Sequence, residues 1–64
     1  MYTATLTAWV LENYYGRHRI TGTIVGSDVK GRFTTGDVIH TSPVVTVDFE
    51  RMEARTRNSF YKLV

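Results

Sequence analysis

The sequence has no cysteine, one proline and only three alanines. Without cysteine, no disulfide can stabilise this chain, whose 64 residues are near the lower size limit for a domain that folds alone. The two histidines, His18 and His40, and the scattered carboxylates do not follow the spacing of a zinc or iron site, so we expect neither a metal nor another cofactor. A small chain without a disulfide or a metal site can gain stability by self-association, so one expectation is a homo-oligomer.

Long hydrophobic runs are also missing. No segment approaches the roughly 20 apolar residues that span a bilayer, and the N-terminus lacks the basic stretch followed by an apolar run that marks a signal peptide. We therefore expect a cytoplasmic protein with no membrane partner. The formal net charge of +2 is a small excess, so the placement of the cations matters more than their number.

Motifs for catalysis are absent from the sequence as well. The glycines between 26 and 31 are not followed by the Gly-Lys-Ser/Thr of a phosphate-binding loop, and no dinucleotide fingerprint is present. His40 and Ser42 would share one face of a strand without the third group that a nucleophilic triad needs. We expect a non-enzymatic protein without catalytic residues.

What the sequence does contain is β-branched residues, because Thr, Val and Ile together make up about a third of it. These residues fit pleated strands and are mildly disfavoured in helices, so composition predicts a single all-β domain over residues 1–64. Strands are expected at 2–12, 19–25, 38–41, 45–49 and 60–64. Residues 50–57 fit either a hairpin around Glu50 and Arg51, which we favour because the β period continues through them, or a short helix.

The first predicted strand alternates strictly. Its apolar positions are Tyr2, Ala4, Leu6, Ala8 and Val10, and between them lie Thr3, Thr5, Thr7 and Trp9. We expect the Ala, Leu and Val side chains to face the core and the threonines to face solvent. Trp9 would then lie on the outer side, where it caps one end of a barrel or belongs to a binding surface. Residues 13–18 are expected to form the following hairpin loop, with Gly16 supplying a positive φ.

Two later segments interrupt the strands. Residues 26–37 contain three glycines and two aspartates, which predict a long loop anchored by Phe33. Pro43 removes a backbone donor and therefore belongs at an edge, a bulge or a break. Five or six short strands in this length predict a small antiparallel barrel, SH3-like or a reduced OB-like form, or a strongly curled meander.

Aromatic and cationic residues are interleaved directly after the first strand. The candidate binding residues there are Tyr14, Tyr15, Arg17, His18 and Arg19, with Trp9 as a neighbour. Tyr and Arg carry much of the energy of protein interfaces, and aromatic rings with arginines also bind unpaired bases and phosphates. The alternative is that one tyrosine packs into the end of the barrel while the cations are solvated.

Two further basic spots lie later in the chain. The second comprises Arg51, Arg55 and Arg57, and the third comprises Lys30 and Arg32. If residues 50–57 form a hairpin, the three arginines of the second spot share one face, although two interleaved glutamates favour a mixed solvated surface. A nucleic-acid function would be favoured if all three basic spots converged on one side.

Three motifs in the second half of the chain resemble short uncharacterised proteins of bacteriophages and prophages. They are Gly31-Arg32-Phe33-x-x-Gly36-Asp37, Thr41-Ser42-Pro43 before a strand, and the closing Thr56-Arg57-Asn58-Ser59-Phe60-Tyr61-x-Leu63. The resemblance implies a compact accessory protein of a bacterial host cell that modifies host or defence machinery by binding it. It carries over no catalytic residues.

Three hypotheses for function result. The first is a non-enzymatic module that docks on a host protein or defence complex through Tyr14, Tyr15, Arg17 and Arg19. The second is a small β-barrel that binds single-stranded nucleic acid, with the same aromatic residues stacking on bases and Arg17, Arg19, Arg55 and Arg57 on phosphates. The third is an oligomer that captures a small anionic ligand, such as a nucleotide, between its subunits.

Overall fold

A computed structural model describes residues 2–26 and 31–64, and these residues form six β-strands and no helix. The strands are β1 (Ala4–Tyr14), β2 (Arg17–Val25), β3 (Val38–His40), β4 (Val44–Asp48), β5 (Glu53–Thr56) and β6 (Phe60–Leu63). The predicted all-β class is therefore confirmed. Within the same residues, no helix is long and apolar enough to cross a membrane.

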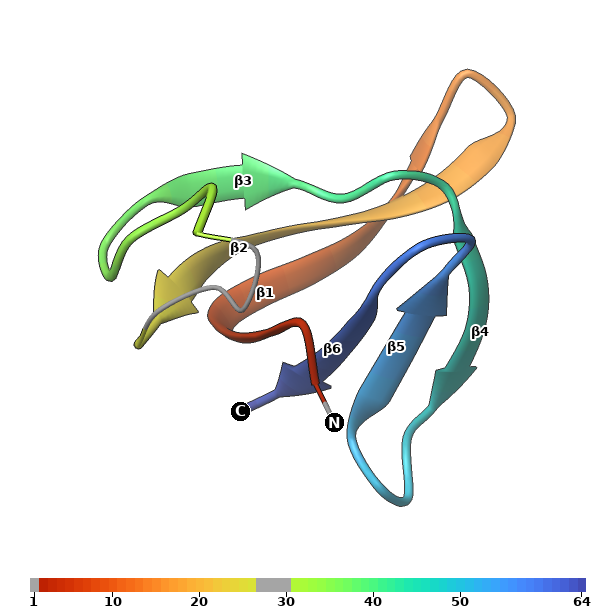
Figure 1. Ribbon diagram of the computed structural model, residues 1–64. Coiled ribbons are helices and arrows are strands. Elements are labelled where there is room, and N and C mark those ends of the chain that lie inside the picture. Colours follow the sequence, from red (N-terminus) through yellow and green to blue (C-terminus); the bar gives the residue numbers. More distant parts are fainter. Residues whose placement is uncertain (1, 27–30) are drawn as a thin grey trace.

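All six strands belong to one mixed sheet with the order β3-β2-β1-β6-β5-β4 (Figure 1). Two antiparallel meanders, β1-β2-β3 and β4-β5-β6, meet where β1 and β6 pair in parallel. The expectation of a purely antiparallel sheet is wrong at this central pair. The reason lies at residues 41–43, where the chain bends after β3 but continues into β4 without reversing its direction.

The sheet is curled but not closed. Only three residues separate β3 from β4, although these strands are the two edges of the sheet, so the edges must approach each other. Pro43 lies in this link, at a break between strands, as its missing donor predicts. In the described part of the chain no ladder joins β3 to β4, so a closed barrel is not confirmed.

The core lies inside the curl and is built from both meanders. Its fully buried large side chains are Leu6, Ile20, Ile24 and Leu63, and Ala4, Ile39, Ala54 and Tyr61 complete it. Phe33 packs against this cluster, which confirms it as the anchor of the long loop. Residues 27–30 of that loop, including Lys30, lie outside the described residues.

A β-bulge at Ala8 reverses the alternation of β1. Thr7 pairs with Thr23 and Val10 with Thr21, so two residues of β1 lie opposite Gly22 alone. Ala8 has a φ of 49°, in the left-handed region. Beyond the bulge the expected faces are exchanged: Val10 is 57% exposed, whereas Trp9 and Leu11 pack against the core. The expectations that Ala8 and Val10 belong to the core and that Trp9 faces outward are wrong for this reason.

Residues 50–57 form the hairpin and not the short helix. The β4–β5 turn spans 49–52, two residues longer than the expected Glu50-Arg51 turn. The Asp48 carboxylate accepts hydrogen bonds from the backbone N–H groups of Glu50 and Arg51, at 3.0 and 3.1 Å. These bonds hold the turn without a glycine.

Candidate binding surface

The β1–β2 hairpin extends beyond the rest of the sheet as a two-stranded arm (Figure 1). β6 pairs with β1 only at residues 4–6, and β3 pairs with β2 only at residues 21–23. Thr41 fastens the base of the arm, because it exchanges two hydrogen bonds with the backbone of Ile20, at 2.8 and 2.9 Å. The loop expected over residues 13–18 is shorter, since Tyr14 still pairs with Arg17.

Tyr15 and Gly16 form the two-residue tip of the arm. Both have a positive φ, of 51° and 78°, as a type I′ hairpin turn requires. The positive φ expected for Gly16 is confirmed, and its N–H donates to the Asn13 side chain at 3.0 Å. Tyrosine is an unusual residue in this conformation, which costs a residue with a side chain about 1 kcal/mol or more.

The Tyr15 ring is the most prominent apolar group of the arm. Its residue is 89% exposed, and its ring meets that of Tyr14 edge to face, with 4.5 Å between the ring centroids. This exposed ring in a strained backbone conformation stabilises the fold little, because the edge contact is worth no more than the backbone conformation costs. Such a combination is typical of residues that contact a partner.

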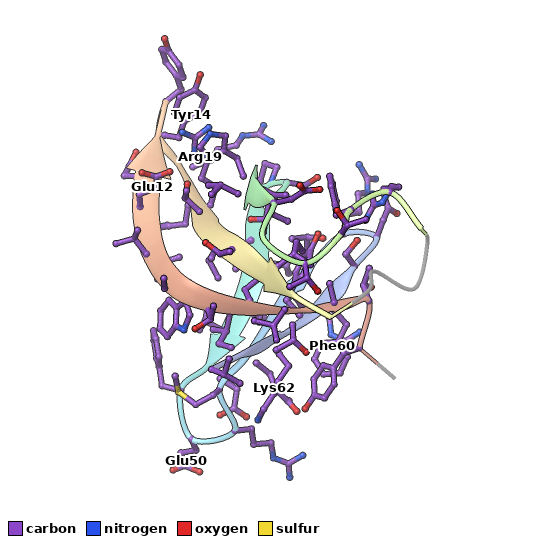
Figure 2. All side chains as sticks on the ribbon, turned by 90° about the vertical axis from the view of Figure 1, so that its left-hand side faces the viewer. Glu12, Tyr14, Arg19, Glu50, Phe60 and Lys62 are labelled. Carbon is purple, nitrogen blue, oxygen red and sulfur yellow. The ribbon has the colours of Figure 1, made fainter. Side chains whose placement is uncertain are left out.

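Arg19 is held by the arm itself. Its guanidinium carbon lies 3.7 Å from the centre of the Tyr14 ring, and its Nε donates to the Glu12 carboxylate at 2.8 Å (Figure 2). The Thr21 hydroxyl donates to the same carboxylate. The bond from Thr21 has the larger effect and the bond from Arg19 the next, and together they hold the pKa of Glu12 below its ordinary value. Arg19 therefore orients Tyr14 and is already neutralised by Glu12.

His40 continues this polar cluster on the outer side of the sheet. Its Nδ1 lies 2.7 Å from the Thr21 hydroxyl, which already donates its proton to Glu12. His40 Nδ1 must then be the donor to that hydroxyl, because the hydroxyl has only one hydrogen.

Two neighbouring depressions follow the arm toward the β5–β6 turn. The first, which we call the hairpin groove, has a volume of about 340 Å³ and is lined by Tyr14, Tyr15, Arg17, His18, Arg19, Thr41 and Pro43. The second, which we call the arginine pocket, has a volume of about 400 Å³ and is lined by Arg17, Ser42, Pro43, Val45, Arg57 and Asn58. Because Arg17 and Pro43 line both depressions, they form one continuous surface.

The cations on this surface differ in whether they are already paired. In residues 2–26 and 31–64, the side chains of Arg17, His18 and Arg57 have no ion pair, hydrogen bond or ring contact. Arg55, by contrast, stacks on Phe60 at 4.2 Å from the ring centre. Among the described residues, the free arginines of this surface are therefore Arg17 on the arm and Arg57 beyond Pro43, and the His18 ring on the arm is also unpaired.

The three basic spots of the sequence converge only in part. Arg57 joins the first spot in the arginine pocket, and with Arg55 it also lines a third depression of about 320 Å³ near Phe60. Arg51 lies in the β4–β5 turn, next to Glu50, which Figure 2 places at the opposite end of the molecule from Tyr14. Arg32 stacks beside Phe33 in the long loop and lines none of these depressions.

The sequence did not predict the apolar wall of this surface, which Pro43 and Val45 form. Pro43 and the 66% exposed Val45 belong to the β3–β4 link and the start of β4, and Val45 lies in a bulge between the paired residues Val44 and Thr46. A proline followed by two valines was the only available signal. Trp9, predicted as a neighbour of the tyrosines, lies in the bulge of β1 and packs against the core.

Within the described residues, no group of three or more His, Asp or Glu side chains could hold a metal ion. Arg17 and Arg57, the exposed tyrosine rings and the apolar wall of Pro43 and Val45 lie on one continuous surface. No protein-family model, no curated protein and no solved structure matches the chain.

Proposed function

We propose that this protein is a non-enzymatic binding module that docks on an acidic and partly apolar surface of another protein. The observation that carries the proposal is Tyr15, which is 89% exposed in a left-handed conformation at the end of a projecting hairpin. The adjoining hairpin groove supplies the side chains of Arg17 and His18, which have no partner among the described residues, and the ring of Pro43. Docking would act by occlusion, because the sequence offers no catalytic motif, and the resemblance to phage proteins suggests host or defence machinery as the target.

Single-stranded nucleic acid is the less favoured partner. Arg19 covers one face of the Tyr14 ring and is paired with Glu12, so this hypothesis has one ring face and one cation fewer than the sequence offers it. Arg55 is also engaged, with Phe60. A protein partner needs only the exposed ring, the free cations and the apolar wall.

The test compares partner capture by two matched variants. Tyr15→Asn removes the ring but keeps a residue that favours the turn, whereas Phe49→Asn removes an exposed ring, 59% accessible, in the β4–β5 turn. Immobilised wild-type protein and Phe49→Asn should capture the same proteins from a bacterial lysate. Tyr15→Asn should lose them, with an affinity at least about 30-fold weaker for the purified partner.

Equal capture by all three proteins would exclude the hairpin tip as the docking site. The nucleic-acid alternative is tested separately, by fluorescence anisotropy with labelled single-stranded DNA and RNA at low and physiological salt. Tight binding that weakens steeply with salt would replace the protein-docking proposal with the nucleic-acid one. An absence of binding at low salt would remove the alternative.

A further inference from the structure

The arginine pocket brings together side chains that are remote in the sequence. Arg17 comes from the start of β2, Ser42 and Pro43 from the β3–β4 link, and Arg57 from the turn between β5 and β6. The parallel β1–β6 pair places the second meander beside the first, so the pocket exists only in the folded chain. It is distinct from the hairpin tip, because neither Tyr14 nor Tyr15 lines it.

The charge of this pocket is uncompensated. Arg17 and Arg57 both line it, and neither has a partner within residues 2–26 and 31–64. Among the described residues, none of those lining the pocket is Asp or Glu. Two guanidinium groups at one cavity repel each other until an anion is placed between them, and their planar donor forks suit an anion with two or more oxygen atoms.

The pocket also has an apolar side, which limits what kind of anion fits. Pro43 and Val45 supply this apolar lining, and the bulge in β4 leaves Val45 exposed. The Ser42 hydroxyl adds one neutral donor. A volume of about 400 Å³ is within the range of small-molecule sites and exceeds what an inorganic ion fills.

We propose that the arginine pocket binds an organic oxyanion, a phosphate ester or a carboxylate that carries a flat apolar group. The oxyanion lies between Arg17 and Arg57, and the apolar group packs on Pro43 and Val45. The site does not depend on the docking proposed above, since the ligand needs no contact with Tyr15.

The proposal is tested by titrating the 15N-labelled protein with phenyl phosphate, benzoate, inorganic phosphate and the neutral analogue benzyl alcohol, with amide shifts as the readout. Phenyl phosphate or benzoate should shift the amides of Arg17, Ser42, Val45 and Arg57 first. Inorganic phosphate should bind more weakly, because it makes no contact with the apolar wall, and benzyl alcohol should not bind. The stronger of the two aromatic anions identifies the oxyanion as an ester or a carboxylate.

Two arginine variants provide the matched comparison. Arg57→Gln should weaken binding of the aromatic anion at least about tenfold, since a hydrogen bond between charged groups is lost. Arg51→Gln removes the same charge from an exposed turn outside the pocket and should leave the affinity unchanged. Tyr15→Asn should also bind the anion normally, which separates this site from the hairpin tip.

Equal weakening by Arg57→Gln and Arg51→Gln would overturn the proposal, because the anion would then respond only to total charge. Benzyl alcohol binding as well as benzoate would overturn it too, since the arginines would have no role. Amide shifts spread over the whole surface, with no preference for the pocket, would also overturn the proposal, because the anion would then have no specific site.

Discussion

Replacing Tyr15 with asparagine should leave the fold as stable or make it more stable, although it removes an aromatic contact. The backbone of Tyr15 has a φ of 51°, and relieving this conformation by Asn should gain roughly 0.5–1 kcal/mol, because Asn adopts the left-handed region at lower cost. The lost edge-to-face contact with Tyr14 is worth ~0.5 kcal/mol at so exposed a position. The free energy of unfolding should therefore rise by about 0–0.5 kcal/mol.

Thermal unfolding followed by circular dichroism measures this change, because 1 kcal/mol shifts the Tm of a domain of this size by roughly 4–8 °C. Tyr15→Val is the control, since it also removes the ring but places a β-branched residue at a positive φ. We expect the order of Tm to be Asn, then Tyr, then Val. A Val variant as stable as the Asn variant would refute the reasoning, because the turn would then impose no constraint on φ.

Three further changes test other parts of the structure. Gly22→Ala should lower the free energy of unfolding by about 1–2 kcal/mol in urea titrations, since the new Cβ would lie 3.1 Å from the Trp9 Cβ; a stabilised variant would show that the bulge yields easily. Leu6→Ala, at a fully buried position, should cost about 2–5 kcal/mol and leave little folded protein; a smaller loss would contradict the described core. The lowered pKa of Glu12 means that its contribution to stability is present above pH 4.5, the ordinary value, and is lost as the pH falls below it. The free energy of unfolding should therefore change less with pH in this range for Glu12→Gln than for the wild type. The same pH dependence in both proteins would exclude the bonds from Thr21 and Arg19 to Glu12.

The strands themselves could be predicted from the sequence, but the faces of β1 could not. Alternation assumes an unbroken pleat, and the bulge at Ala8 exchanges the two faces without any glycine or asparagine to announce it. Gly22, the residue opposite, was the only sign, because a side chain there would crowd Trp9. Alternation alone therefore places Val10 in the core, whereas it is 57% exposed.

The sheet order depended on a bend that local patterns do not specify. Pro43 predicts a break, but not whether the chain reverses there, and that choice decides whether β1 and β6 run parallel. The same limit applies to the binding surface. Tyr14, Tyr15, Arg17 and His18 could be grouped because they are neighbours in the chain, whereas the approach of Arg57 to Arg17 depends on the sheet order.

The central position of β6 determines when the sheet can form during synthesis. β1 and β6 are the two middle strands, yet Phe60–Leu63 is translated after every other strand of the sheet. Until this segment leaves the ribosome, β1 has a free edge and the β4–β5 hairpin has nothing to pair with. The ribosome-bound chain would expose two unjoined fragments of the core, so folding is completed only after residue 63 has emerged, and a nascent chain without β6 would be open to proteases and to pairing with other unfinished strands.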